Sequence, residues 1–278
     1  MAGRHVEVEV RHAADADAVR AVLRAFPADD QSPLAPPDLR CVVDRGANGL
    51  WEVGDGTTVT HHAATLEDAL LAIEWRLVSD LLARNPDRFH LHGAALADPS
   101  GTISVLVLGD SGVGKTTTTL ALIARGFRPF ADDVVLIDPE TLLPDWFPRA
   151  FHVDTQTREL VAPLFEQPDW EEPGLPAGYC LPRTWATERL PIGAIILPKG
   201  YGHPIPTLMQ QSISTAALAV LGNTSTLEHA PRLALRTAAR LTAQAPAFVL
   251  YSGDLPTTVA MIASTVKTII ESAAERGA

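Results

Sequence analysis

The feature that most constrains the fold is a glycine-rich run between an apolar segment and a helical one. The run has the Walker A pattern G-x-x-x-x-G-K-[ST], and its residues are Gly109, Asp110, Ser111, Gly112, Val113, Gly114, Lys115 and Thr116. Residues 105–108 before it are all apolar, and residues 115–125 after it are typical of a helix that Gly126 ends. A strand, a glycine-rich loop and a helix in this order predict an α/β domain around a buried sheet.

The fixed positions of this run have chemical reasons. Glycines let the backbone curl so that successive N–H groups point at phosphate oxygens, and the dipole of the following helix favours the same anion. We expect Lys115 to reach the β- and γ-phosphates and the Thr116 hydroxyl to coordinate Mg²⁺. Thr117 continues the first helical turn and is counted with residues 109–116 as nucleotide-binding. The run indicates a site for ATP and Mg²⁺.

Composition excludes one class of partner. The formal net charge is -11, and lysine occurs only at Lys115, Lys199 and Lys267. A general nucleic-acid binder needs clustered Lys and Arg to neutralise phosphates, so we expect no nucleic-acid partner. An ATP site tolerates this acidity, because backbone N–H groups and a metal ion provide much of the phosphate recognition.

Apolar patterning indicates a cytoplasmic protein with no membrane partner. Residues 1–10 contain charges where a signal peptide needs an apolar core. No uninterrupted apolar stretch approaches the roughly 18 to 20 residues that span a membrane. The two cysteines, Cys41 and Cys180, are far apart in the chain and are expected to be reduced.

Two regions of different texture are expected, with a boundary near Pro86. Residues 1–86 predict a small α+β region, in which alternating apolar residues form strands and Thr65 caps a helix that starts at Leu66. Residues 87–278 predict the P-loop domain, with buried strands at 89–96, 102–108, 134–137, 193–197 and 247–251 and helices at 215–221, 231–243 and 257–274. Residues 145–178 are predicted to be a long, irregular connection, and loops of this length inside a compact domain often form functional lids or contact substrate.

Acidic residues around the strand at 134–137 allow two interpretations. In the first, this is a Walker B strand, and Asp138 at its end holds Mg²⁺. In the second, the adjacent Asp132 and Asp133 at its start are the functional pair. Neighbouring side chains of an extended segment point to opposite sides, so one carboxylate would face the metal and the other an acceptor.

Several short motifs together resemble HPr kinase/phosphorylase. Besides the P-loop they are Leu91-His92-Gly93-Ala94, Ala124-Arg125-Gly126-Phe127, Ala131-Asp132-Asp133-Val134 and Pro148-Arg149. The chain is more similar still to the shorter HPr-kinase-like proteins encoded beside bacterial peptide natural-product genes, which also have a variable N-terminal region. The resemblance covers residues 89–152, and it implies a fold like that of phosphoenolpyruvate carboxykinase, a mixed β-sheet with a P-loop.

The resemblance also implies roles for residues, and it favours the second interpretation of the acidic pair. Asp133 would be the general base on an acceptor hydroxyl, Asp132 would help Thr116 hold Mg²⁺, and His92 would lie near the γ-phosphate. Arg149 and Lys199 are candidates for gripping the acceptor or the transferred phosphate, because Arg and Lys stabilise developing negative charge.

Departures from the family's pattern limit what is carried over. Thr116-Thr117 stand where that family usually has Ser-Glu, and its downstream glycine-rich signature is not found, so phosphorolysis and HPr as substrate are not expected. We expect a kinase that moves the ATP γ-phosphate to a Ser or Thr of a peptide or small protein, or to a small-molecule hydroxyl. The alternative is a nucleotide-gated regulatory NTPase without a phosphorylated acceptor. HPr kinases form hexamers, but the N-terminal region of this chain differs from theirs. The hexamer is therefore not carried over, and the oligomeric state, a homo-oligomer included, is left open.

Overall fold

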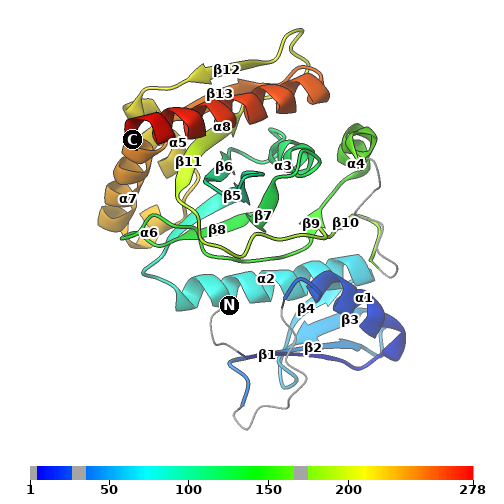
Figure 1. Cartoon of the computed structure of the whole chain (residues 1–278). Coiled ribbons are helices and arrows are strands. Elements are labelled where there is room, and N and C mark those ends of the chain that lie inside the picture. Colours follow the sequence, from blue (N-terminus) through cyan, green and yellow to red (C-terminus); the bar gives the residue numbers. More distant parts are fainter. Residues whose placement is uncertain (1–4, 27–35, 166–174, 278) are drawn as a thin grey trace. The chain divides into compact units, whose positions relative to one another are not determined.

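The structure, a computed structural model, describes residues 5–26, 36–165 and 175–277. The chain forms two compact units that divide at Asn85 and Pro86 (Figure 1). The first unit contains the residues up to Asn85 and, of the described residues, also 175–181, while the second contains the rest. Across these described ranges, none of the helices combines the length and apolar character that crossing a membrane requires.

The first unit is a four-stranded sheet with two helices, in the strand order β1-β2-β3-β4. Its elements are β1 (Val6–Val10), α1 (Ala13–Leu23), β2 (Leu39–Arg45), β3 (Trp51–Gly54), β4 (Val59–Ala63) and α2 (Leu66–Arg84). Strands β1 and β2 are parallel and are connected through α1, whereas β2, β3 and β4 follow one another as antiparallel neighbours. Helix α2 packs on β2, β3 and β4.

The start of α2 agrees with the predicted cap. The Thr65 side chain accepts a hydrogen bond from the Asp68 backbone N–H at 3.1 Å, and its hydroxyl donates to the Asp68 carboxylate at 2.8 Å. This satisfies one of the helix N–H groups that have no partner within the helix. From there the apolar face of α2 buries Leu70, Ile73 and Leu77.

The division near residue 86 is not continuous along the chain, because residues 175–181 group with the first unit. Strand β10 (Tyr179–Cys180) belongs to the first unit, although the sequence analysis placed these residues in the P-loop domain, directly after the irregular connection. The reason is a buried polar contact: the Tyr179 hydroxyl donates to the Glu74 carboxylate of α2 at 3.2 Å. Both residues are buried, and a buried polar group requires such a partner.

The second unit contains a seven-stranded mixed sheet in the order β12-β13-β11-β6-β5-β7, with β8 also paired to β5. Its strands are β5 (Phe89–Ala97), β6 (Ser104–Leu108), β7 (Arg128–Ala131), β8 (Val134–Ile137), β11 (Ile192–Pro198), β12 (Thr207–Gln210) and β13 (Ala247–Tyr251). Strands β6, β11 and β13 are parallel, while β5 and β12 are antiparallel to their neighbours. All five residues of β6 are buried, so both faces of the sheet centre are covered. The predicted mixed α/β architecture is confirmed.

Helices of the second unit form two groups that cover the sheet (Figure 1). They are α3 (Lys115–Ile123), α4 (Thr155–Val161), α5 (Ile213–Gly222), α6 (Thr226–His229), α7 (Pro231–Gln244) and α8 (Leu255–Gly277), and a 3-10 turn, η1 (Ala162–Leu164), follows α4. Helix α3 packs with α8, and α5 and α6 pack with α7.

Residues 145–178 are more regular than the sequence predicted. They contain α4, η1 and a short strand, β9 (Phe151–His152), while residues 166–174 of this prediction lie outside the described residues. Asp154 begins α4, because its carboxylate accepts a hydrogen bond from the Thr157 N–H at 2.6 Å. The abundance of Pro and acidic residues in this stretch concealed a helix that has an ordinary N-cap.

Candidate functional site

The P-loop lies between the carboxyl end of β6 and the start of α3, as its sequence predicted. Gly112 and Gly114 have φ angles of 79° and 96°, which glycine adopts without strain. No other heavy atom lies within 4 Å of the position that a Cβ at Gly112 would occupy, so the loop is open there. The Lys115 ammonium donates to the Asp110 carbonyl at 2.9 Å, which holds it over the loop.

The acidic pair lies at a kink between β7 and β8. Both strands run antiparallel along β5, with Ala131 opposite Ala95 and Val134 opposite His92. Between them Asp133 has a φ of 65°, and the Val134 N–H donates to the Asp132 carbonyl at 2.8 Å, which is the bond of a three-residue turn. The backbone of the pair is therefore not extended. The prediction that the two side chains alternate because they lie in an extended segment is wrong. A left-handed non-glycine residue is uncommon and concentrates at functional sites.

Strand β5 brings the kink to the P-loop. The Gly93 N–H donates to the Asp133 carbonyl at 3.3 Å, and Gly93 also pairs with Leu108, the last residue of β6. A Cβ at Gly93 would collide with the Val107 carbonyl and would lie 2.6 Å from the Leu108 side chain, so only glycine allows this close approach. The His-Gly strand, the aspartates and the P-loop are thus neighbours in space.

Two side chains, those of His92 and Arg149, hold the Asp133 carboxylate. His92 Nδ1 lies 3.1 Å from Asp133 Oδ1, and Arg149 Nη1 donates to Oδ2 at 2.9 Å. The hydrogen bond from His92 and the charge of Arg149 lower the pKa of Asp133 to about 2, although burial acts in the opposite direction. The same hydrogen bond raises the pKa of His92. The Asp133 side chain is 51% exposed and that of Arg149 only 9%, so the carboxylate is accessible while the arginine supports it from below the surface.

Asp132 has the opposite electrostatic environment. It is only 8% exposed, and burial together with the neighbouring charge of Asp133 raises the pKa of Asp132 to about 7. Lys115 lies in the field of both carboxylates: burial lowers the pKa of its ammonium, and the charges of Asp133 and Asp132 oppose that change. Adjacent carboxylates whose pKa values are moved apart are typical of sites where the two groups have different tasks.

Asp138 holds a turn at the far end of β8. Its carboxylate accepts hydrogen bonds from the Glu140 and Thr141 N–H groups at 2.9 and 3.0 Å and pairs with Arg88. The Thr141 bond is the main reason that the pKa of Asp138 is lowered to about 2. The four-residue length of β8, roughly 13 Å, separates Asp138 from the P-loop end. Its partners therefore give Asp138 a structural role.

The two weaker substrate candidates differ in their surroundings. Arg149 donates to Asp133 and so lies within the cluster. Lys199 follows β11, the strand next to β6, and its N–H donates to the Leu250 carbonyl at 2.9 Å. The Lys199 side chain is exposed at the same end of the sheet as the P-loop.

Three residues of this end of the sheet were missed by sequence analysis. The Thr117 hydroxyl lies 3.1 Å from that of Thr157 and 3.2 Å from that of Tyr201. The Asn223 carbonyl accepts the His92 N–H at 2.8 Å. Two glycines flank Tyr201 in the loop after a buried strand, which is a signal that was available, whereas no sequence pattern marks Thr157 or Asn223.

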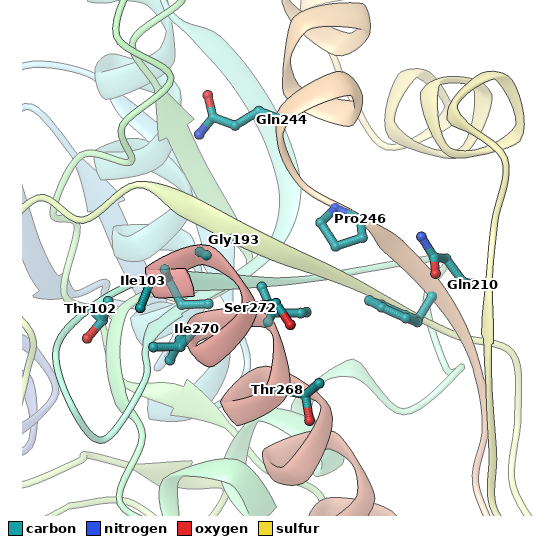
Figure 2. Close-up of a pocket in the computed structure, with 13 residues that line it drawn as sticks. Thr102, Ile103, Gly193, Gln210, Gln244, Pro246, Thr268, Ile270 and Ser272 are labelled. Carbon is teal, nitrogen blue, oxygen red and sulfur yellow. The ribbon is translucent and has the colours of Figure 1, made fainter. Parts of the chain in front are cut away.

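A cavity of about 510 Å³ lies at the other end of the central strands. Ile103 and Gly193, at the beginnings of β6 and β11, line it together with Gln210, Gln244 and Thr268 (Figure 2). Its lining contains no charged side chain. Because ligands of open α/β sheets bind at the carboxyl ends of the strands, the P-loop end remains the candidate functional site.

No protein-family model matches the chain. A 70-residue segment is 49% identical to HPr kinase/phosphorylase of Limosilactobacillus reuteri and covers 24% of this chain and 21% of that protein. The chain resembles HPr kinase/phosphorylase. The enzyme of that name from Nitrosomonas europaea is 46% identical over 77 residues, which cover 27% of this chain and 23% of the relative. The matched segments thus span only about a fifth to a quarter of these relatives.

A solved structure, the Hpr(Ser) kinase/phosphatase of Coxiella burnetii, aligns with 64% of this chain and 94% of its own. The TM-score is 0.31 at 12% sequence identity, which is too low to support an argument about the fold. The likeness to HPr kinase/phosphorylase therefore rests on the sequence segments.

Proposed function

We propose that the second unit binds ATP with Mg²⁺ on residues 109–117 and transfers the γ-phosphate to a hydroxyl group of an acceptor. The observation behind this proposal is the meeting of three segments: the P-loop after β6, the His92-Gly93 step of β5 and the Asp132-Asp133 kink. A phosphate cradle next to one carboxylate able to hold Mg²⁺ and another able to orient a hydroxyl supplies the parts that phosphoryl transfer uses.

The P-loop fits a nucleotide and its metal. In the first turn of α3 the N–H groups of residues 115–117 point out of the helix, because the first internal bond runs from Thr118 to the Gly114 carbonyl at 2.9 Å. These amides and Lys115 would hold the phosphates. Thr116 and Asp132 would hold Mg²⁺, which neutralises charge on the β- and γ-phosphates.

Asp133 is our candidate for the general base. An acceptor hydroxyl would donate to its carboxylate while the hydroxyl oxygen attacks the γ-phosphorus and the bond to the β-phosphate breaks. A pKa of about 2 makes Asp133 a weak proton acceptor, but it keeps the carboxylate ionised at neutral pH. Phosphoryl transfer depends mostly on positioning and charge stabilisation, so an ionised carboxylate fixed by His92 and Arg149 serves to orient the hydroxyl.

His92 and Arg149 would then have different roles, one at the γ-phosphate and the other at Asp133. His92, whose pKa is raised by its hydrogen bond to Asp133, would lie near the γ-phosphate, and Arg149 would orient Asp133. Lys199, exposed at the same end of the sheet, is the group that we assign to the acceptor or the transferred phosphate. The name of the curated relatives supports a protein acceptor, and we propose a Ser or Thr hydroxyl in a peptide or small protein, with a small molecule as the alternative.

The pairing of Asp133 with His92 and Arg149 also supports a second candidate, a regulatory P-loop NTPase without a phosphorylated acceptor. In that function the two contacts would keep Asp133 from binding an acceptor hydroxyl, and water would be the only nucleophile. Its signature is Mg²⁺-dependent formation of ADP with no phosphate transferred.

The test compares wild type with Asp133→Asn and with Asp138→Asn as the matched control. Each protein is incubated with γ-labelled ATP and the peptide and protein products of neighbouring genes, and mass spectrometry detects a gain of one phosphate. We expect Asp133→Asn to retain ATP affinity and to lower transfer by a factor on the order of 100 or more, while Asp138→Asn retains both. Equal loss in both variants would instead favour Asp138 as the metal ligand, and ADP formation without transfer would favour the regulatory NTPase.

A further inference from the structure

The loop after β11 presents a tyrosine to the P-loop. Gly200 and Gly202, with φ angles of 139° and 79°, flank Tyr201. The loop is anchored to the end of β13, because the Ser252 N–H donates to the Gly200 carbonyl at 3.1 Å and the His203 N–H donates to the Ser252 carbonyl at 3.1 Å. The position of Tyr201 is thus set by backbone hydrogen bonds on both sides.

The hydroxyl end of Tyr201 rests on the first turn of α3. A Cβ at Gly114 would lie 2.5 Å from Tyr201 Cζ and 2.7 Å from Cε1, so the ring lies directly against the glycine. The Tyr201 hydroxyl is 3.2 Å from that of Thr117, which Thr157 contacts from the other side at 3.1 Å. Tyr201 is nevertheless 48% exposed, so much of its ring is open to solvent beside the phosphate cradle.

The direction in which a nucleotide would lie in the phosphate cradle indicates which part of it this ring would face. Lys115 and the two aspartates mark the end of the cradle where the γ-phosphate would lie. Thr117, two residues beyond Lys115, contributes the last of the outward N–H groups of α3, so we expect the nucleoside to leave the cradle past Thr117 and Tyr201. An exposed aromatic ring is a surface on which a sugar or a base packs well.

We propose that Tyr201 binds the nucleoside part of the nucleotide, with its ring against the sugar and base and its hydroxyl fixed by Thr117. This inference rests on the proposed function, since it needs a triphosphate in the cradle. It assigns recognition of the nucleoside to the β11–β12 loop and recognition of the phosphates to the P-loop. A ligand that consists of phosphates alone should therefore be indifferent to Tyr201.

The test separates these two parts of the ligand by calorimetry on the full chain. Dissociation constants are measured for ATP and for inorganic tripolyphosphate, each with Mg²⁺, in wild type, Tyr201→Ala and Tyr201→Phe. Ile205→Ala is the control, because Ile205 lies in the same loop and is 75% exposed. Tyr201→Leu is a second variant that removes the ring but keeps more apolar volume than alanine, in case the alanine variant does not fold.

We expect Tyr201→Ala and Tyr201→Leu to weaken ATP binding on the order of ten-fold, the scale of one base–aromatic stack, and to change tripolyphosphate binding by less than about two-fold. Tyr201→Phe should stay close to wild type, because the ring remains. Equal weakening of both ligands would overturn the proposal in favour of a purely structural support of the P-loop. Tighter binding of both would overturn it in favour of a ring that blocks the cradle. A wild-type protein that binds tripolyphosphate and ATP equally would also refute it, whereas failure to bind either ligand would refute the proposed function itself.

Discussion

Replacing Asp132 by asparagine should stabilise the protein without ligand while removing its function. The pKa of Asp132 is raised from an ordinary 3.8 to about 7, which at 1.36 kcal/mol per unit is about 4 kcal/mol. Between these two values the native state keeps a proton that the unfolded chain has released. The unfolded state therefore binds fewer protons, and stability falls as the pH rises through this window.

Asparagine does not ionise, so the Asp132→Asn variant escapes this cost. We expect it to be more stable than wild type at pH 8 by about 2 to 4 kcal/mol, and the difference should shrink towards zero as the pH approaches 4. Urea denaturation at pH 8 and pH 4.5, without Mg²⁺ or nucleotide, measures both values. Adding Mg²⁺ and ATP should stabilise wild type more than the variant, because a bound cation favours the ionised carboxylate.

Asp138→Asn is the matched control, since the same chemical change meets the opposite pKa shift. The pKa of Asp138 is lowered to about 2, so its carboxylate contributes stability above pH 3.8 that is lost as the pH falls through 2. Asp138→Asn should therefore be less stable than wild type at pH 8 and at pH 4.5, by about 2 kcal/mol. An Asp132→Asn variant that is less stable than wild type at pH 8, or equally shifted at both pH values, would refute the assigned burial of Asp132.

Other substitutions test the fold around the site. Thr65→Ala removes the N-cap of α2 and should cost about 1 kcal/mol of unfolding free energy in urea, with no change in ATP affinity; an altered affinity would contradict the independence of this cap from the site. Gly93→Ala should cost about 1 to 3 kcal/mol, because its Cβ collides with the Val107 carbonyl. Gly93→Ala should also weaken ATP binding in calorimetry, since Val107 and Leu108 lead into the P-loop, and unchanged stability and affinity would show that β5 and β6 are less closely packed.

Local sequence was sufficient for the P-loop and for most elements. The Walker A run predicts its own geometry, because glycine torsions and the unpaired N–H groups of a helix start depend only on neighbouring residues. Local sequence also predicted the Thr65 cap of α2 and the role of Gly126, which follows α3 and has a φ of 85°. The helix α4 was missed because proline and acidic residues dominate the stretch around it.

The segment that resembles HPr kinase/phosphorylase pointed to the Asp132-Asp133 pair, but sequence could not describe its geometry. The expected extended pair is a three-residue turn with Asp133 in the left-handed region. Its opposed pKa shifts arise because one carboxylate is buried and the other contacts His92 and Arg149. Burial and ion pairing depend on residues that lie far apart along the chain.

Sequence by itself thus determined the strand–loop–helix unit and the residue types able to bind phosphate. Only the tertiary structure decided how distant residues join them: His92, which the resemblance had suggested, through the register of β8 on β5, and Tyr201, which the sequence analysis had missed, through the anchoring of its loop to β13. The physical reason is that backbone torsions are set by local sequence, whereas strand register and packing are set by the whole sheet. A chemical site built from several strand ends therefore depends on contacts that no local pattern contains.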